Sequence, residues 1–518
     1  DGYWIVDLIY YSIVYKIILM LGTYYTFPEL LIWIPFVTGL IAIFIKNDKS
    51  VKMFALLSSI ATLAVSIISL FYSDIAHHPE FFYDNNVSYV WMPYIGSSFS
   101  VGLDGMGFLV TFLTAFSYPL IFAATYKTQY KNSNAFFALM LLSQAGIMGV
   151  FVATDALLFY FFWELALIPI YFLCSKWGGE RRVQATFKFF VYTFLGSLLM
   201  LVGIIYVYVH TTSVSPDSVH SFSLHSFYNV LLSPHQQSWV FWLFFIAFAV
   251  KIPIFPLHTW QPDVYEQSNY PAVMVLSGVM VKMGVFGMIR WLLPIFPAAV
   301  AKYNHFVIVL CIIGILYASC IALYQNDLKR FVAWSSIAHL GLMGAAIFSV
   351  NSLGLQGGMV EMLNHGINIL ALWIIVDIIE KKTGVRKITE LGGLGVKSPV
   401  LALFLVIIAF ANIALPLSNS FVGEFLMFSG LFQLNKWFAA FAVLGIVLSA
   451  FYMLAMVQKV FYGKVNGLTE KVTSISMTQR IVLFVIVISI IFLGIYPEPV
   501  IHLTQSTVTG ILNKVIMR

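Results

Sequence analysis

The stretch of sequence that decides the fold is Trp239-Val-Phe-Trp-Leu-Phe-Phe-Ile-Ala-Phe-Ala-Val-Lys-Ile-Pro-Ile-Phe-Pro-Leu-His-Thr-Trp260. Its length matches the roughly 20 mostly apolar residues that a helix needs to cross bilayer hydrocarbon. Peptide groups in hydrocarbon must be paired within the segment, so a run of this kind forms a helix. Pro253 and Pro256 remove backbone donors beside Lys251 and predict a break in this helix.

Similar stretches recur along the whole chain. Hydrophobic residues make up 60% of the 518 residues and charged residues only 10%, whereas soluble domains are nearer half apolar and a quarter charged. We therefore predict an all-α polytopic membrane protein with about fourteen transmembrane helices. The expected spans are 27–45, 51–72, 106–126, 134–152, 156–175, 186–210, 239–260, 271–294, 303–324, 328–350, 357–379, 399–433, 437–461 and 480–502.

Basic residues alternate between successive connections. Counted from the amino terminus, the odd-numbered connections hold most of the Lys and Arg residues, such as Arg181, Arg182, Lys329 and Arg330. This positive-inside pattern places the odd connections in the cytoplasm and the long loops at about 73–105 and 211–238 outside. The net charge of +6 forms no basic face, which argues against a nucleic-acid partner and leaves lipids as the surrounding medium.

The first 26 residues are expected to form an extra hydrophobic or interfacial segment. They carry Asp7 and Lys16 and lack the small-residue cleavage site of a signal peptide. Cys174, Cys311 and Cys320 are too few and too far apart for a zinc site or an iron–sulfur cluster, so we expect three buried free thiols and no redox centre.

A second break is predicted between Asn412 and Glu424, around Pro416. Broken helices in both halves are the usual sign of an inverted-repeat transporter, and one shift of about 174 residues superposes both breaks. The predicted units are N-terminal helices at 27–133, five-helix repeats at 134–294 and 303–462, and a last span with a tail at 463–518.

Ionisable residues at mid-span are candidate functional groups, because charge is costly in hydrocarbon. Buried lysines beside movable carboxylates, and histidines, exchange protons near neutral pH, which suits a proton relay. The candidates are Glu164, Lys251, Lys282, His339, His365 and Glu424. Asp104 and Asp155, at span edges, are expected to be caps or anchors.

Structural roles for the same residues stay open at this stage. Glu164 and Lys251 could form a static ion pair, and Lys282 could extend its amine to the membrane interface. His339 could be a buried histidine satisfied by Ser335 or Ser336, and a similar role is open for His365.

Six motifs, in order along the chain, resemble those of the antiporter-like subunits of respiratory complex I. They are Phe161-Phe-Trp-Glu-Leu-Ala-Leu-Ile-Pro-Ile-Tyr-Phe-Leu173, Phe248–Asp263, Val281–Arg290, Asp327–Gly341, Asn364-His-Gly366 and Phe421-Val-Gly-Glu-Phe425, and the resemblance covers roughly residues 27–505. Of the three subunit types, L, M and N, the chain is most similar to M, since Glu424 and Lys282 match that type.

The resemblance implies a function and a role for each residue. A subunit of this type translocates protons in a bacterial inner membrane, beside neighbouring subunits L and N, while other subunits bind NADH, FMN, iron–sulfur clusters and quinone. Glu164 and Lys251 would be an ion pair of the first half-channel. Lys282, His339 and His365 would be the central relay, and Glu424 the outward exit.

Two other functions share parts of this pattern. Subunits of multi-subunit cation/proton antiporters carry most of the same motifs, and neighbouring genes for NADH- and iron–sulfur-binding subunits would separate the two. A passive membrane scaffold is the third, and unchanged pumping after replacement of Glu164 or Lys251 would favour it.

Overall fold

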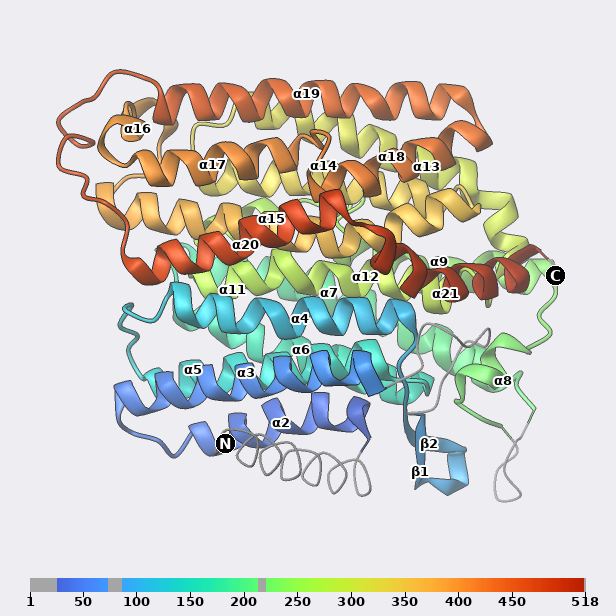
Figure 1. Cartoon of the computed structure of the whole chain (residues 1–518). Coiled ribbons are helices and arrows are strands. Elements are labelled where there is room, and N and C mark those ends of the chain that lie inside the picture. The colour runs from blue at the N-terminus through green and yellow to red at the C-terminus, as the bar shows by residue number, and fades with distance from the viewer. Residues whose placement is uncertain (1–25, 73–85, 213–219, 517–518) are drawn as a thin grey trace, which may run out of the picture.

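The computed structural model describes residues 26–72, 86–212 and 220–516, and these are mostly helical (Figure 1). The expected segment at 1–26 lies outside this range except for its last residue. Helices of the amino-terminal half are α2 (Phe27–Ala42), α3 (Asp48–Tyr72), α4 (Gly105–Ala124), α5 (Ser133–Val152), α6 (Ala156–Lys176), α7 (Arg182–Tyr208), α8 (Leu224–Tyr228), α9 (Pro234–Lys251), α10 (Gln261–Gln267), α11 (Tyr270–Val275) and α12 (Val281–Gly287).

The second half continues the same bundle. Its helices are α13 (Pro297–Leu323), α14 (Leu328–Ile347), α15 (Ser352–Thr383), α16 (Leu394–Lys397), α17 (Pro399–Asn412), α18 (Asn419–Leu434), α19 (Lys436–Phe461), α20 (Met477–Ile495) and α21 (Glu498–Ile516), with a 3₁₀ turn η4 (Ile388–Glu390). Within the described residues, eleven helices are long and apolar enough to cross a membrane, and α2 and α17 are shorter apolar helices. The chain is thus a mostly helical membrane protein, while the count of fourteen and the inverted repeats remain predictions.

One β-hairpin interrupts the helical pattern. Strands β1 (Val87–Met92) and β2 (Ser97–Val101) pair antiparallel across the 3₁₀ turn η1 (Pro93–Ile95). These residues fall in the long loop expected at about 73–105, so the all-α prediction did not include this hairpin.

Contacts between loops follow the predicted alternation. Isolated bridges join Val101 to Ala153 and Asp155 to Ser223, all in even-numbered connections. Two others, Gly178 to Ser268 and Asp327 to Lys387, join odd-numbered connections. The hairpin and α8 lie at one end of the bundle and α16 at the other (Figure 1). Even and odd connections therefore lie on opposite sides of the bundle, as the charge pattern predicted.

Both predicted helix breaks are present. Helix α9 ends at Lys251 and α10 begins at Gln261, whereas α17 ends at Asn412 and α18 begins at Asn419. In the second break Ala414 and Leu417 adopt positive φ angles of 54° and 74°. Left-handed backbone is unfavourable for residues with a side chain, so surrounding contacts must hold this segment.

A third irregularity was not predicted. The expected span 271–294 contains two π-helical turns, η2 (Leu276–Met280) and η3 (Met288–Leu292), on either side of α12. A π turn inserts one residue into the helical ladder and is frequent at functional sites. Lys282 is the second residue of α12, which follows the first of these turns.

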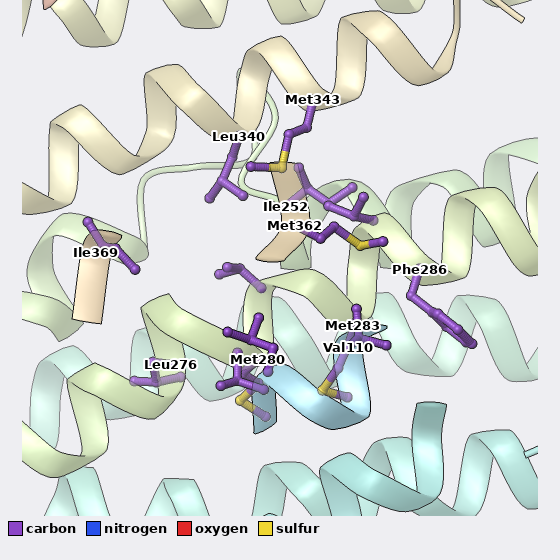
Figure 2. Packing of buried hydrophobic residues seen from close by; sticks show 14 of the residues in the cluster. Val110, Ile252, Leu276, Met280, Met283, Phe286, Leu340, Met343, Met362 and Ile369 are labelled. Carbon is purple, nitrogen blue, oxygen red and sulfur yellow. The ribbon is translucent and has the colours of Figure 1, made fainter. Parts of the chain in front are cut away.

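The middle of the bundle is packed with methionine and branched aliphatic side chains. Figure 2 shows Val110 of α4, Met280 of η2, Met283 of α12, Met343 of α14 and Met362 of α15 among the residues of this cluster. All five are fully buried. The segments that carry Lys282, His339 and His365 thus lie among buried apolar side chains.

The expected last span divides into two helices. Helix α20 ends at Ile495, and after Pro497 helix α21 runs toward the end of the bundle that carries the hairpin (Figure 1). A Cβ atom built on Gly105, at the start of α4, would lie 1.7 Å from the Leu503 carbonyl oxygen, so α21 packs tightly against α4.

Candidate functional site

Lys251 ends helix α9 inside the protein. Its side chain is 2% exposed and its Nζ has no hydrogen-bond partner within the described residues. The amine lies 5.5 Å from the ring centroid of Trp163 and 5.7 Å from that of Phe189. Aromatic faces attract a cation but accept no strong hydrogen bond, so they stabilise the charged amine only in part.

Glu164 lies half-buried on α6, and one carboxylate oxygen, Oε1, has no partner in the described part of the chain. Ser197 of α7 lies beside the carboxylate. No described ion pair within 4.0 Å joins Glu164 to Lys251. The expected direct ion pair is therefore wrong for this structure, since the two groups interact only at longer range.

Lys251 and Lys282 approach each other across Gly284. A Cβ atom on Gly284 would lie 2.9 Å from the Cβ of Lys251 and 2.8 Å from the carbonyl oxygen of Phe248. Only glycine allows this contact, because any side chain would meet the last turn of α9. The missing side chain at position 284 therefore sets how closely the two lysine-bearing segments pack.

Lys282 is fully buried, which excludes extension of its amine to the membrane interface. Its Nζ donates to the Ser277 carbonyl at 3.0 Å and contacts Nδ1 of His365 at 2.8 Å. The Ser277 carbonyl belongs to η2, the π turn that precedes α12. The π turn thus supplies one of the two groups that hold the lysine.

His365 links Lys282 to the second half of the site. Its Nε2 lies 3.4 Å from the Ser336 hydroxyl. When Nδ1 accepts from the lysine, Nε2 must carry the ring proton and can donate to this hydroxyl. The His365 and His339 ring centroids are 5.7 Å apart, so the ionisable groups continue from one ring to the next.

His339 ends this series on Glu424. Its Nδ1 donates to Oε1 of Glu424 at 3.1 Å, and Glu424 is 2% exposed. The expected partners Ser335 and Ser336 do not bind His339. A 20 Å³ cavity adjoins both groups and is also lined by Ser449 and Tyr452 of α19. That volume is about the size that one water molecule needs.

The sequence analysis missed Glu361, which lies on α15 within this cluster. It is 1% exposed, and its Oε1 accepts from the Ser420 hydroxyl at 3.0 Å. Glu361 falls near the start of the expected span 357–379, where a charged residue is ordinary. Its position one helical turn before His365 was the available signal, since such residues share a helix face.

Three asparagines surround the second helix break. Asn364 donates to the Asn419 carbonyl at 2.8 Å, and Asn368 donates to Oδ1 of Asn419 at 3.1 Å and to the Ser420 hydroxyl at 2.9 Å. In all three bonds an amide of α15 donates to an oxygen of the first two residues of α18. They hold Ser420 and Glu424 against α15.

Asp104 and Asp155 are caps, as predicted. Asp104 accepts from the Gly107 amide at 2.7 Å and pairs with Arg290 at 2.5 Å inside the protein.

Asp155 lies between α5 and α6 and accepts from the amides of Leu157 and Leu158, both at 3.0 Å. Burial raises the pKa of Asp155 to about 6 despite these hydrogen bonds. Asp155 thereby fixes the start of the helix that carries Glu164.

The cysteines differ from the expectation at one position. Cys174 and Cys311 are buried, whereas Cys320 is exposed on α13. The prediction that all three thiols are buried was therefore wrong. Within the described residues, no group of three His, Cys, Asp or Glu side chains is arranged to hold a metal ion.

Comparisons with known proteins agree with the motifs. A family model described as NADH:quinone oxidoreductase/Mrp antiporter, transmembrane, matches residues 153–449. NADH-quinone oxidoreductase subunit M of Rhodobacter capsulatus is 36% identical over 472 residues, covering 90% of this chain and 91% of that protein. F(420)H(2) dehydrogenase subunit M of Methanosarcina mazei is 31% identical and covers 94% of this chain and 98% of that protein.

A solved structure shares the fold. A chain of respiratory complex I from Thermus thermophilus with bound NADH superposes with a TM-score of 0.84 at 26% identity, covering 93% of this chain and 99% of that chain.

Proposed function

The chain belongs to the NADH:quinone oxidoreductase/Mrp antiporter transmembrane family, and from that premise we propose that it translocates protons as subunit M of an NADH:quinone oxidoreductase. Protons move through its buried ionisable residues, and quinone reduction elsewhere in the complex supplies the energy.

The series from Lys282 to Glu424 carries this proposal. It joins Lys282 to His365 at 2.8 Å, His365 to His339 at 5.7 Å between ring centroids, and His339 to Glu424 at 3.1 Å. Each member can gain and lose a proton, and neighbouring charges change how tightly it is held. Charges at this depth are costly, and transport is the usual reason that they are kept.

Glu164 and Lys251 are the proposed entry to this series. Their longer separation suits water-mediated transfer, because water bridges polar groups that do not touch. Such a bridge would satisfy Glu164 Oε1 and Lys251 Nζ, for which the described part of the chain offers no hydrogen-bond partner. Gly284 keeps Lys251 against the segment that carries Lys282.

The same proposal places the chain in an assembly. Other membrane subunits of the complex would flank it, with the antiporter-like subunits L and N as its neighbours in the inner membrane of a bacterium. NADH, FMN, iron–sulfur clusters and quinone would be held by other subunits.

Glu164→Gln and Lys251→Met, made in the intact complex, test the proposal. Proton pumping is measured with a pH-sensitive dye in sealed vesicles, beside the rate of NADH oxidation and assembly on native gels. We expect pumping to fall in both variants with assembly retained. Lys302→Met, which removes an exposed lysine on α13, is the matched control. Unchanged pumping in an assembled Lys251→Met complex would exclude the relay and favour a scaffold.

A cation/proton antiporter subunit is the second candidate, because the family model covers both kinds of protein. The 36% identity to a relative named NADH-quinone oxidoreductase subunit M supports the first. Vesicles decide between them: pumping that needs NADH supports the oxidoreductase, and sodium/proton exchange without NADH supports the antiporter. Pumping driven by F(420)H(2) alone would assign the chain to a complex with another electron donor.

A further inference from the structure

A buried carboxylate lies beside the proposed relay and has no role in it so far. Glu361 lies on α15, one helical turn before His365, and its side chain is 1% exposed. Its Oε1 accepts a hydrogen bond from Ser420, the Asn364 side chain lies beside the carboxylate, and its Oε2 makes no hydrogen bond within the described residues. A purely structural carboxylate would have both oxygens satisfied, because an unpaired buried polar atom is costly.

Two charged members of the relay act on Glu361 from neighbouring helices. Glu361 interacts electrostatically with Lys282 and with Glu424. Among the residues that the structure describes, Glu361 is the carboxylate that acts on Lys282. Two carboxylates buried near each other cannot both be ionised cheaply, so they tend to share a proton.

The backbone of α18 is shaped around this carboxylate. A Cβ atom on Gly423 would lie 2.3 Å from Oε2 of Glu361 and 3.0 Å from its Cβ. Gly423 directly precedes Glu424. Gly423 thus leaves room for the Glu361 carboxylate, because it has no side chain. Ser420, one turn earlier on α18, donates to the other oxygen.

We propose that Glu361 is a further proton-carrying residue, which receives a proton from Lys282 and holds it in alternation with Glu424. In this step the Lys282 ammonium loses one proton and becomes a neutral amine, while the Glu361 carboxylate gains that proton and becomes a carboxylic acid. Glu424 releases its own proton to the outward side, its proposed exit, as Glu361 is filled, so one proton enters the pair, one leaves it, and the pair holds one proton throughout. The inference rests on the proposed pumping function and adds a second storage site to it.

Glu361→Gln in the intact complex is the direct test. Glutamine keeps the shape and the oxygen that accepts from Ser420, but it cannot carry a proton. We expect proton pumping to fall at least about tenfold, because a positioned proton carrier contributes this much or more. The pH profile of pumping should also lose one titrating step. Glu361→Asp, which keeps a carboxylate, should restore part of the rate and the step.

Gly423→Ala is a second variant, and it removes no ionisable group. The added methyl group displaces the Glu361 carboxylate, so proton pumping should fall in this variant too. Gly467→Ala is the matched control, because a Cβ atom there would have no neighbour within 4 Å. Equal pumping in Gly423→Ala and Gly467→Ala complexes would contradict the inference.

Glu424→Gln separates failure of this inference from failure of the proposed function. If Glu361→Gln pumps with the parental rate and pH profile while Glu424→Gln does not pump, Glu361 carries no proton and the pumping function stands. If both assembled variants pump normally, the proposed function itself is wrong.

Discussion

Replacing Gly284 by alanine would separate the two lysines that the proposed relay needs. The new Cβ atom would lie 2.7 Å from Cγ1 of Ile252, 2.8 Å from the Phe248 carbonyl oxygen and 2.9 Å from the Lys251 Cβ. Non-bonded carbon atoms are most stable about 3.5–4.0 Å apart, so the end of α9 must move by roughly 1 Å. The carbonyl and the Cβ belong to the helix itself and cannot turn aside.

Two magnitudes follow from this displacement. Overpacking of this kind costs about 1–3 kcal/mol of stability. A misplacement of about 1 Å can slow a reaction that depends on alignment by about 100-fold. We therefore expect the Gly284→Ala complex to assemble, to unfold at a somewhat lower temperature, and to pump protons about ten- to a hundredfold more slowly than the parent.

The assay compares pumping in vesicles with native-gel assembly, and Gly278→Ala is the matched control. Gly278 lies in the preceding π turn, and its nearest neighbour would be the Gly366 carbonyl oxygen at 3.7 Å, an ordinary contact. If the two assembled variants pump equally, the packing of α9 against α12 does not control proton transfer, and the reasoning fails.

Three further predictions concern the buried charges. Asp104→Ala leaves Arg290 without its carboxylate partner and should lower the free energy of unfolding by about 3–5 kcal/mol, as measured by chemical denaturation in detergent. Asp104→Asn should lose less stability, because the asparagine side chain can still cap the helix. Lys282→Met should abolish pumping but change the free energy of unfolding by less than about 2 kcal/mol, because removal of a desolvated amine offsets the lost hydrogen bonds. A large loss of stability on thermal unfolding would contradict this prediction. Because the pKa of Asp155 is raised to about 6, its contribution to stability is fully present below about pH 4 and lost as the pH rises through 6. The stability of the parent relative to Asp155→Asn should therefore fall between pH 4 and pH 6, and a constant difference would refute it.

The sequence predicted the two helix breaks because prolines remove backbone donors in either helix. Pro253 and Pro256 follow Lys251, and Pro416 lies between Asn412 and Asn419. The π turns beside Lys282 left no such signal, since Leu276 to Met280 are residues that an ordinary helix accepts. Their position depends on packing against neighbouring helices, which a single sequence does not contain.

The candidate residues were predictable by type and depth, but their mutual geometry was not. Charge within an apolar run identified Glu164 and Lys251, yet spacing along the chain could not show that they lie more than 4.0 Å apart. Glu361 was missed for a related reason. It lies near the expected start of its span, where its charge did not single it out, and the packing of α18 against α15 buries it.

The hydrogen bond between Thr507 and Asp104 has a consequence for the order of assembly. The Thr507 hydroxyl of α21 donates to Oδ2 of Asp104 at 3.0 Å, on the same carboxylate that pairs with Arg290. The ribosome synthesises Thr507 about four hundred residues after Asp104, so the amino-terminal helices enter the membrane before this hydrogen bond can form. The helices enter the membrane one after another, but the contact between α21 and α4 can form only after the last helix has been synthesised.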